Sequence, residues 1–211
     1  MSPPSDARTL VLHGLRLKGF AETPAVAEAV AVPEGVVKVQ LDDLVTDGLA
    51  SYRDGRMSGF TLTPAGRLEH ARRLQEELEA AGVRPAIEAA YERFLAHNGE
   101  LLAVCTAWQL RPVDGESRVN DHEDSAYDAP VIERLAALHD RIEPVCTDLG
   151  EALERFSGYG PRLGTALLRL QAGDPDWFTK PMIPSYHTVW FELHEDLLAT
   201  LDIDRGREVA G

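Results

Sequence analysis

The chain has 211 residues, of which 44% are hydrophobic, and a formal net charge of −14 at pH 7. This length suits one large or two small domains, and the apolar content is enough for a packed core rather than a disordered chain. No apolar run approaches the roughly 18 residues of a membrane span, and the first residues lack the apolar core of a secretion signal, so we expect a cytoplasmic protein.

The charge is unevenly distributed along the chain. Residues 1–75 contain 9 Lys and Arg against 9 Asp and Glu, whereas residues 76–211 contain 12 against 26 and carry the whole excess of acid. An acidic second half would repel DNA and so orient the more basic edge of the first half toward it. The same acid could instead serve only to keep a helical domain soluble.

Two helices are predicted near the start of the chain. The first covers residues 6–18, where the apolar residues share one face, and Gly19 ends it. The second covers residues 24–31. Thr23 is an N-cap candidate there, and Pro24 sits at the first helical position, where its missing N–H costs nothing.

A third helix and a hairpin are predicted next. The helix opens at Glu34, has an apolar face, and ends at Gly48. Two short runs with strand character, residues 49–52 and 60–63, then flank Asp54-Gly55, a dipeptide that favours a hairpin turn. Thr63 followed by proline predicts the start of another helix, as at residue 23.

The order helix, short turn, helix, hairpin, helix is that of a winged helix-turn-helix. The segments LVTDGLASYRDGR (44–56) and FTLTPAGR (60–67) resemble bacterial transcriptional regulators of the MarR and PadR type. The resemblance covers residues 6–82. It implies a DNA-binding domain with a small β-hairpin wing, within a protein of mainly α class.

The resemblance also implies a DNA-reading surface on the third helix and the hairpin. Lys38 and Gln40 would face the major groove, where Lys can read guanine and Gln can read adenine. Arg53 and Arg56 on the hairpin would contact phosphates.

One feature of the third helix departs from the family pattern. Asp42 and Asp43 are adjacent acids on the helix that should approach phosphates. They leave open a winged helix that contacts a protein instead of double-stranded operator DNA.

The helix that begins at Pro64 is predicted to be long and to carry a thin apolar seam between charged flanks. The seam consists of Leu68, Ala71, Leu74 and Leu78. A narrow seam suits helix pairing, and the resemblance implies a homodimer, so Leu74 and Leu78 are candidates for the subunit contact. The alternative is a solvated connecting helix. Gly82 and Pro85 mark a domain boundary between residues 6–82 and 83–204.

Residues 83–204 are predicted to form an all-α helical bundle, and no family resemblance covers them. The apolar stripes predict four helices: 85–110, 129–156, a shorter one after Pro161, and 184–201. Residues 111–127 are polar and acidic, and we expect a loop there.

This second half is a candidate for effector binding or dimerisation. All three tryptophans lie in it, and residues 177–191 form its most aromatic stretch. An aromatic wall with a few polar groups is typical of a small-molecule pocket, here for an aromatic or carboxylate-bearing effector. Ordinary bundle core is the alternative. The candidate ligand-binding residues are Asn98, Trp108, Lys180, Tyr186, His187 and Trp190.

Signals for catalysis are weak, and we expect neither an enzyme nor a cofactor. Cys105 and Cys146 lie on apolar helix faces and are predicted to be buried, reduced thiols. His187 and His194 are about 10 Å apart along one helix, at roughly 1.5 Å per residue, which is too far for one metal ion. A metal site that combines one of these histidines with residues 121–124 stays open as a weaker alternative, a small metal-dependent enzyme.

The sequence therefore predicts a dimeric DNA-binding transcriptional regulator with a helical ligand-sensing or dimerisation domain. The main alternative is a winged-helix protein-interaction module without DNA binding.

Overall fold

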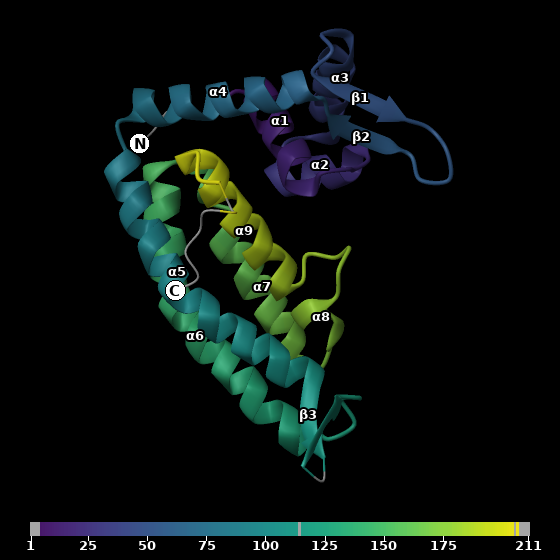
Figure 1. Ribbon diagram of the computed structural model, residues 1–211, viewed down its shortest axis with the longest axis vertical. Helices are drawn as coiled ribbons and strands as arrows, with labels where there is room; N and C mark the ends of the chain where they lie inside the picture. Colours follow the sequence, from purple (N-terminus) through teal and green to yellow (C-terminus); the bar gives the residue numbers. More distant parts are fainter. Residues whose placement is uncertain (1–4, 114, 205, 207–211) are drawn as a thin grey trace. The chain divides into compact units, whose positions relative to one another are not determined.

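The computed structural model describes residues 5–113, 115–204 and 206, and these are mainly helical with two short antiparallel hairpins (Figure 1). No helix among these residues is both long and apolar enough to cross a membrane. The described residues separate into two compact units. The first unit contains the described residues up to Arg84, the segment Ala152–Arg155 and the described residues from Glu195 onward. The second unit contains Pro85–Glu151 and Phe156–His194.

The first unit opens with three helices, α1 (Ala7–Lys18), α2 (Thr23–Val30) and α3 (Glu34–Thr46). Their apolar faces meet in one core with the strands that follow. This core contains Val11, Leu12, Leu15, Ala21, Val26, Ala27, Val37, Leu41, Leu44, Ala50 and Leu62. The prediction that Thr23 is the N-cap of α2 is wrong. Thr23 is the first residue of this helix, and Glu22 takes the cap position without a side-chain hydrogen bond.

A hairpin follows α3. Strand β1 (Ala50–Arg53) pairs antiparallel with β2 (Gly59–Leu62), with Ala50 opposite Leu62. The hairpin is attached to the chain between α1 and α2, because Ala21 forms a β-bridge with Phe60. Its turn projects from the body of the first unit (Figure 1).

Helix α4 (Pro64–Ala81) begins at the N-cap that the sequence predicts: Thr63 Oγ1 accepts a hydrogen bond from the Gly66 amide at 3.1 Å. Leu74 and Leu78 on this helix are both 0% exposed within the single chain. The prediction that these two leucines pair subunits is therefore wrong, because their side chains are already packed inside the monomer.

A buried charged cluster, made of His13, His70, Glu77, Arg155 and Asp196, lies inside the first unit. His13 Nδ1 lies 3.0 Å from His70 Nε2, and His13 Nε2 lies 2.9 Å from Asp196 Oδ2. Arg155 donates to Glu77 at 2.8 Å and also to Asp196. Through this cluster, two segments from late in the chain, one around Arg155 and one around Asp196, become part of the first unit.

The second unit is built from five helices: α5 (Arg84–Gln109), α6 (Ser125–Ala152), α7 (Tyr159–Gln171), α8 (Asp176–Thr179) and the part of α9 (Tyr186–Leu201) up to His194. The 3₁₀ turn Glu154–Phe156 stands at the boundary, since only Phe156 belongs to this unit. Helices α5 and α6 lie side by side (Figure 1), joined by the ion pairs Arg93–Asp148 and Arg141–Glu100. The α9 helix is joined to α7 by the pair Arg162–Glu192.

The expected loop over 111–127 is wrong. Strands β3 (Leu110–Val113) and β4 (Glu116–Val119) form a hairpin there, and α6 begins at Ser125 rather than at residue 129. The physical reason is that both faces of this hairpin meet solvent, with Val119 79% exposed, so the strands lack the alternation of apolar and polar residues that marks a half-buried strand.

Candidate functional site

The exposed face of α3 is the first part of the candidate site. It carries the predicted base-reading residue Lys38, and the buried Val37 and Leu41 fix its orientation from behind. The other predicted base reader, Gln40, is only half-exposed and lies on a different side of the helix. Lys38 is already engaged, because its ammonium lies 2.9 Å from the Asp42 carboxylate one helical turn away. Both partners are exposed, so the pair is weak and can open at little cost.

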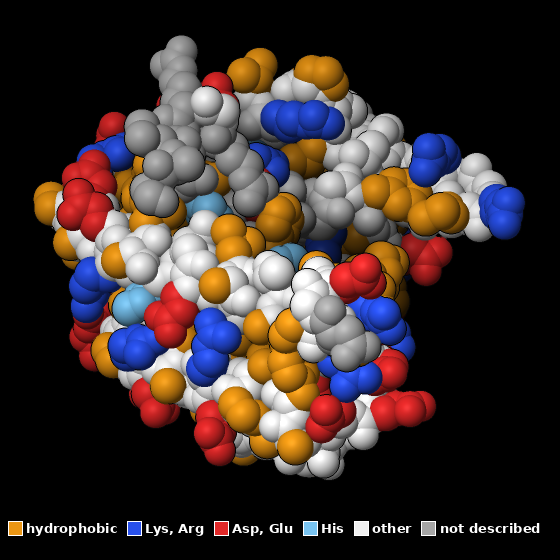
Figure 2. Space-filling model, turned by 60° about the horizontal axis from the view of Figure 1, so that its bottom comes forward, with side chains coloured by type: hydrophobic (Ala, Val, Ile, Leu, Met, Phe, Trp, Pro, Cys, Tyr) orange, Lys and Arg blue, Asp and Glu red, His pale blue; other side chains and the backbone are white. Residues whose placement is uncertain are grey.

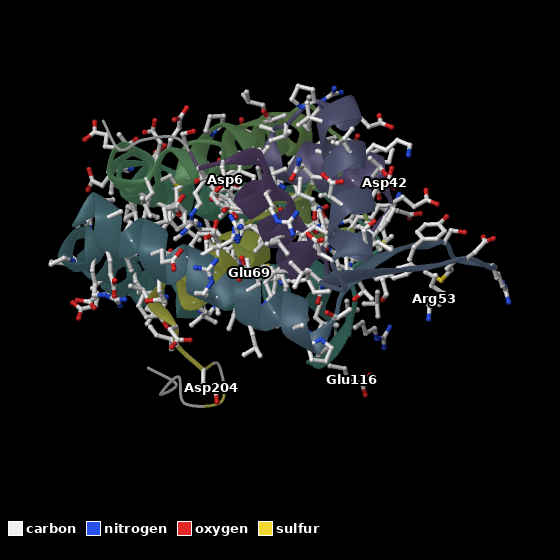
Figure 3. The ribbon with its side chains drawn as sticks, turned by 90° about the horizontal axis from the view of Figure 1, so that it is seen from above. Asp6, Asp42, Arg53, Glu69, Glu116 and Asp204 are labelled. Carbon is white, nitrogen blue, oxygen red and sulfur yellow. The ribbon has the colours of Figure 1, made fainter. Side chains whose placement is uncertain are left out.

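The β1–β2 hairpin is the second part. Arg53 lies at the end of β1, and its guanidinium carbon is 4.6 Å from the centre of the Phe20 ring, a cation–π contact that limits its movement. Arg56 lies in the exposed turn. Figure 2 shows basic side chains on the projecting hairpin, and in Figure 3 Arg53 and Asp42 both point outward from the first unit.

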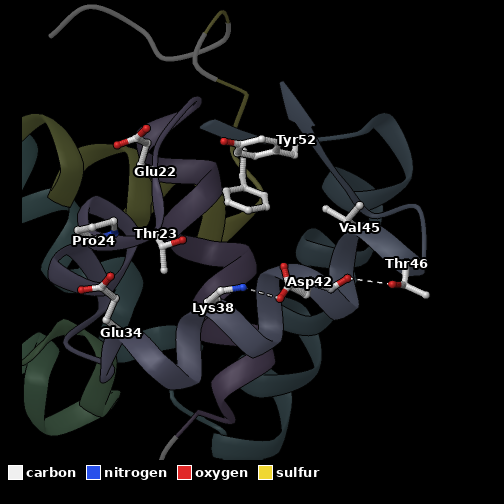
Figure 4. A pocket seen from close by; sticks show the side chains of 10 residues that line it. Glu22, Thr23, Pro24, Glu34, Lys38, Asp42, Val45, Thr46 and Tyr52 are labelled. Carbon is white, nitrogen blue, oxygen red and sulfur yellow. Dashed lines mark hydrogen bonds and ion pairs between the residues drawn. The ribbon is translucent and has the colours of Figure 1, made fainter. Parts of the chain in front are cut away.

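Between α2, α3 and β1 lies an open groove of about 730 Å³ (Figure 4). Its lining combines three carboxylates, one lysine, an aromatic pair and apolar side chains. The lining residues are Glu22, Thr23, Pro24, Glu34, Lys38, Asp42, Val45, Thr46, Tyr52 and Phe60. The rings of Tyr52 and Phe60 are 4.8 Å apart.

The charge on this face is acidic. From Glu22 to Arg56, which covers α2, α3 and most of the hairpin, the chain has 3 Lys and Arg against 7 Asp and Glu. The balanced charge of residues 1–75 thus conceals an acidic α3 face beside a basic hairpin turn.

Comparisons with protein-family models, with curated proteins and with solved structures gave no match for this chain.

The predicted effector site in the second unit is brought together only in part. Trp190 Nε1 donates to Asn98 Oδ1 at 3.1 Å, and the Tyr186 ring stacks 6.4 Å from that of Trp190. Tyr186 is fully buried, which raises the pKa of its phenol, and its hydroxyl contacts His139. These side chains satisfy one another, an arrangement that fits bundle core and leaves few polar groups for a ligand.

The other predicted effector residues have different surroundings. Trp108 packs on His122, with ring centres 4.0 Å apart, and on Phe178. Lys180 is exposed and pairs with Asp176, which raises the pKa of the lysine. Burial lowers the pKa of the partly buried His187.

A polar cluster that sequence reasoning missed lies beside Trp108. Asp128 accepts from Asn120 Nδ2 at 2.7 Å and lies 3.0 Å from His122 Nδ1, while Asn120 also donates to the Trp108 carbonyl. His122 has a φ of 61°, a left-handed conformation uncommon outside glycine. The cluster ties the β3–β4 hairpin to the start of α6. In the sequence, this cluster is marked only by the acidic residues around His122. Those residues suggested a metal site rather than hydrogen bonds between the hairpin and α6.

No group of three His, Cys, Asp or Glu side chains suited to a metal ion is found in the part of the chain that the structure describes. His194 packs its ring against Phe94 at 5.2 Å, and Glu195 lies 3.4 Å from Arg16. Cys105 and Cys146 are buried free thiols, and burial raises the pKa of each to about 12, so neither is suited to nucleophilic chemistry.

Proposed function

We propose that the first unit is a winged helix-turn-helix domain, similar to those of MarR- and PadR-type regulators, and that the protein is a DNA-binding transcriptional regulator. One observation carries the proposal: α2, a short turn, α3 and a projecting hairpin follow one another over a common core, with α1 and α4 behind them. This places one exposed helix beside one exposed hairpin, the pair of elements that a winged helix offers to a duplex.

Within this proposal the hairpin supplies affinity and α3 supplies base contacts. Arg53 and Arg56 are exposed cations that neutralise phosphates, a contact that does not depend on sequence. Lys38 can reach a guanine edge once it leaves Asp42, and Gln40 lies on the same helix.

The proposed regulator is a homodimer, because a single winged helix offers few contacts and a two-fold protein matches a palindromic operator. Since Leu74 and Leu78 are buried, the subunit contact must use other residues. An aromatic or carboxylate-bearing effector of the second unit remains part of the proposal. The hydrogen bond from Trp190 to Asn98 argues against an effector site at these two residues, because Asn98 Oδ1 already has a partner.

The test is salt-dependent binding of a labelled duplex taken from the DNA upstream of the gene. Replacing Arg53 and Arg56 by alanine should weaken binding to every duplex and reduce the slope of log affinity against log salt by about 2, because each phosphate contact releases counterions. The double variant Arg118→Ala, Arg134→Ala makes the same change of charge on exposed residues of the second unit and should leave the slope unchanged. DNA binding that is absent, or unaffected by the hairpin variant, would overturn the proposal.

A second candidate function, docking of a protein, is favoured by the composition of the α3 face. Val39 is 57% exposed and Tyr52 is 50% exposed, and Tyr52 lines the groove together with three carboxylates. Exposed apolar side chains with an acidic rim suit a protein surface better than a phosphate backbone.

A further inference from the structure

The groove between α2, α3 and β1 has a charge opposite to that expected of a phosphate-binding surface. Glu22, Glu34 and Asp42 line it, and its one lysine is neutralised by Asp42. Neither Glu22 nor Glu34 forms an ion pair with any residue that the structure describes. The groove therefore presents uncompensated negative charge.

The same groove also has an apolar part. Tyr52 and Phe60 form a tilted ring pair at one wall, and Val45 stands beside them on α3. Val45 is 38% exposed and Tyr52 is 50% exposed, so both offer apolar surface to an occupant of the groove. Its volume of about 730 Å³ falls within the range of ligand-binding sites.

We propose that this groove binds a cationic segment of a partner protein, with apolar anchors between its Lys or Arg residues, and that the segment excludes DNA from α3. Lysine or arginine side chains pair with Glu22 and Glu34 and compete with Lys38 for Asp42, and a cation over the ring of Tyr52 gains a further attraction. The apolar anchors cover Val45 and the ring of Tyr52, which removes their surface from water. The exclusion of DNA rests on the proposed function, whereas peptide binding itself does not.

The test uses a labelled synthetic peptide of alternating lysine and leucine blocks, measured by fluorescence anisotropy with the whole protein. A peptide with glutamate in place of lysine is its control. We expect binding of the lysine peptide that weakens as salt is raised, and no binding of the glutamate peptide. The double variant Glu34→Gln, Asp42→Asn should weaken lysine-peptide binding roughly tenfold, since it removes two of the three groove carboxylates.

A matched variant separates local from general charge effects. Glu133→Gln with Asp140→Asn makes the same chemical change at two exposed positions of α6 and should leave peptide binding unaltered. Equal effects of the two double variants would overturn the proposal, as would equal binding of the two peptides.

DNA binding by the groove variant should change in the opposite direction. Glu34→Gln with Asp42→Asn removes repulsion of phosphates and releases Lys38, so duplex binding should strengthen while peptide binding weakens. In the unmodified protein, excess lysine peptide should displace the duplex. Peptide binding without any DNA binding would refute the proposed regulator but leave the groove assignment standing, whereas a duplex that binds together with the peptide would refute the exclusion.

Discussion

His70 is buried against a second imidazole, and this makes the stability of the first unit sensitive to acid. Burial lowers the pKa of His70 to about 3, and the neighbouring His13 acts in the same direction. The unfolded chain binds a proton at His70 below about pH 6.5, whereas the folded chain does not. The stability that depends on neutral His70 is thus present above pH 6.5 and is lost as the pH falls from 6.5 toward 3.

We predict that the free energy of unfolding falls by about 2 kcal/mol between pH 6.5 and pH 5 because of His70 alone, at about 1.4 kcal/mol per pH unit. Urea unfolding at several pH values measures this. His70→Gln should flatten the dependence, while His97→Gln, a histidine of the second unit outside the cluster, should preserve it. The same slope in His70→Gln and in the unmodified protein would contradict the prediction.

Gly66 is required by a close approach of the backbone. A Cβ on this residue would stand 1.9 Å from the Leu49 carbonyl oxygen, which already accepts from the Thr63 amide at 3.0 Å. Gly66→Ala should therefore displace the start of α4 and cost about 3 kcal/mol of unfolding free energy. Gly99→Ala, in a helix with open space at the Cβ position, should instead stabilise by up to about 1 kcal/mol. Thermal unfolding of both variants tests the contrast.

At the scale of the element, α4 is a helix packed inside one chain rather than an open seam. Leu74→Ala should create a cavity and cost about 3 kcal/mol of unfolding free energy, because its side chain is fully buried. Leu68→Ala, on the same helix at 74% exposure, should change stability by less than about 0.5 kcal/mol. Light scattering should give the same mass for both variants. If Leu74→Ala instead converted a dimer into a monomer without lowering its stability, Leu74 would belong to the subunit interface.

Elements with local signals were predicted well. Asp54-Gly55 marks the first hairpin, and Thr63-Pro64 marks the start of α4, because turn and cap chemistry is written in a few adjacent residues. The second hairpin was missed because its strands bury neither face. The burial of a helix face by segments far away in the chain leaves no pattern in the helix itself. The narrow apolar stripe of α4 therefore suggested a partner subunit, although residues of the same chain cover it.

The candidate site was predictable to a similar degree. Resemblance placed Lys38 and Arg53 on the surface, where the structure has them, whereas Gln40 is only half-exposed. The spacing of Lys38 and Asp42, four residues apart in a helix, could have indicated their ion pair. The groove could not be predicted, because Glu22, Asp42 and Tyr52 meet only when α2, α3 and β1 pack together.

At the scale of the whole molecule, the first unit is stabilised by residues from distant parts of the chain. Asp196 and Arg155 are both almost fully buried, and although burial opposes it, the charges of Arg155 and His13 hold the pKa of the Asp196 carboxyl well below its usual range. Asp196→Asn should cost about 3 kcal/mol of unfolding free energy, because it leaves a buried guanidinium poorly compensated. Asp148→Asn breaks an exposed pair with Arg93 and should cost less than about 1 kcal/mol. Chemical denaturation of the two variants provides the comparison.

The position of Asp196 and Arg155 in the buried charged cluster also has a consequence for synthesis on the ribosome. Domains near the start of a chain commonly fold while the rest is still being translated. Here His13 emerges early, but its carboxylate partner lies in the last helix, and Glu77 must wait for Arg155. The cluster therefore closes only after Asp196 has left the exit tunnel. Until then the cluster is incomplete, so nascent chains halted before Asp196 should be digested by protease in the first unit. Chains extended by a linker that brings Asp196 out of the exit tunnel should resist.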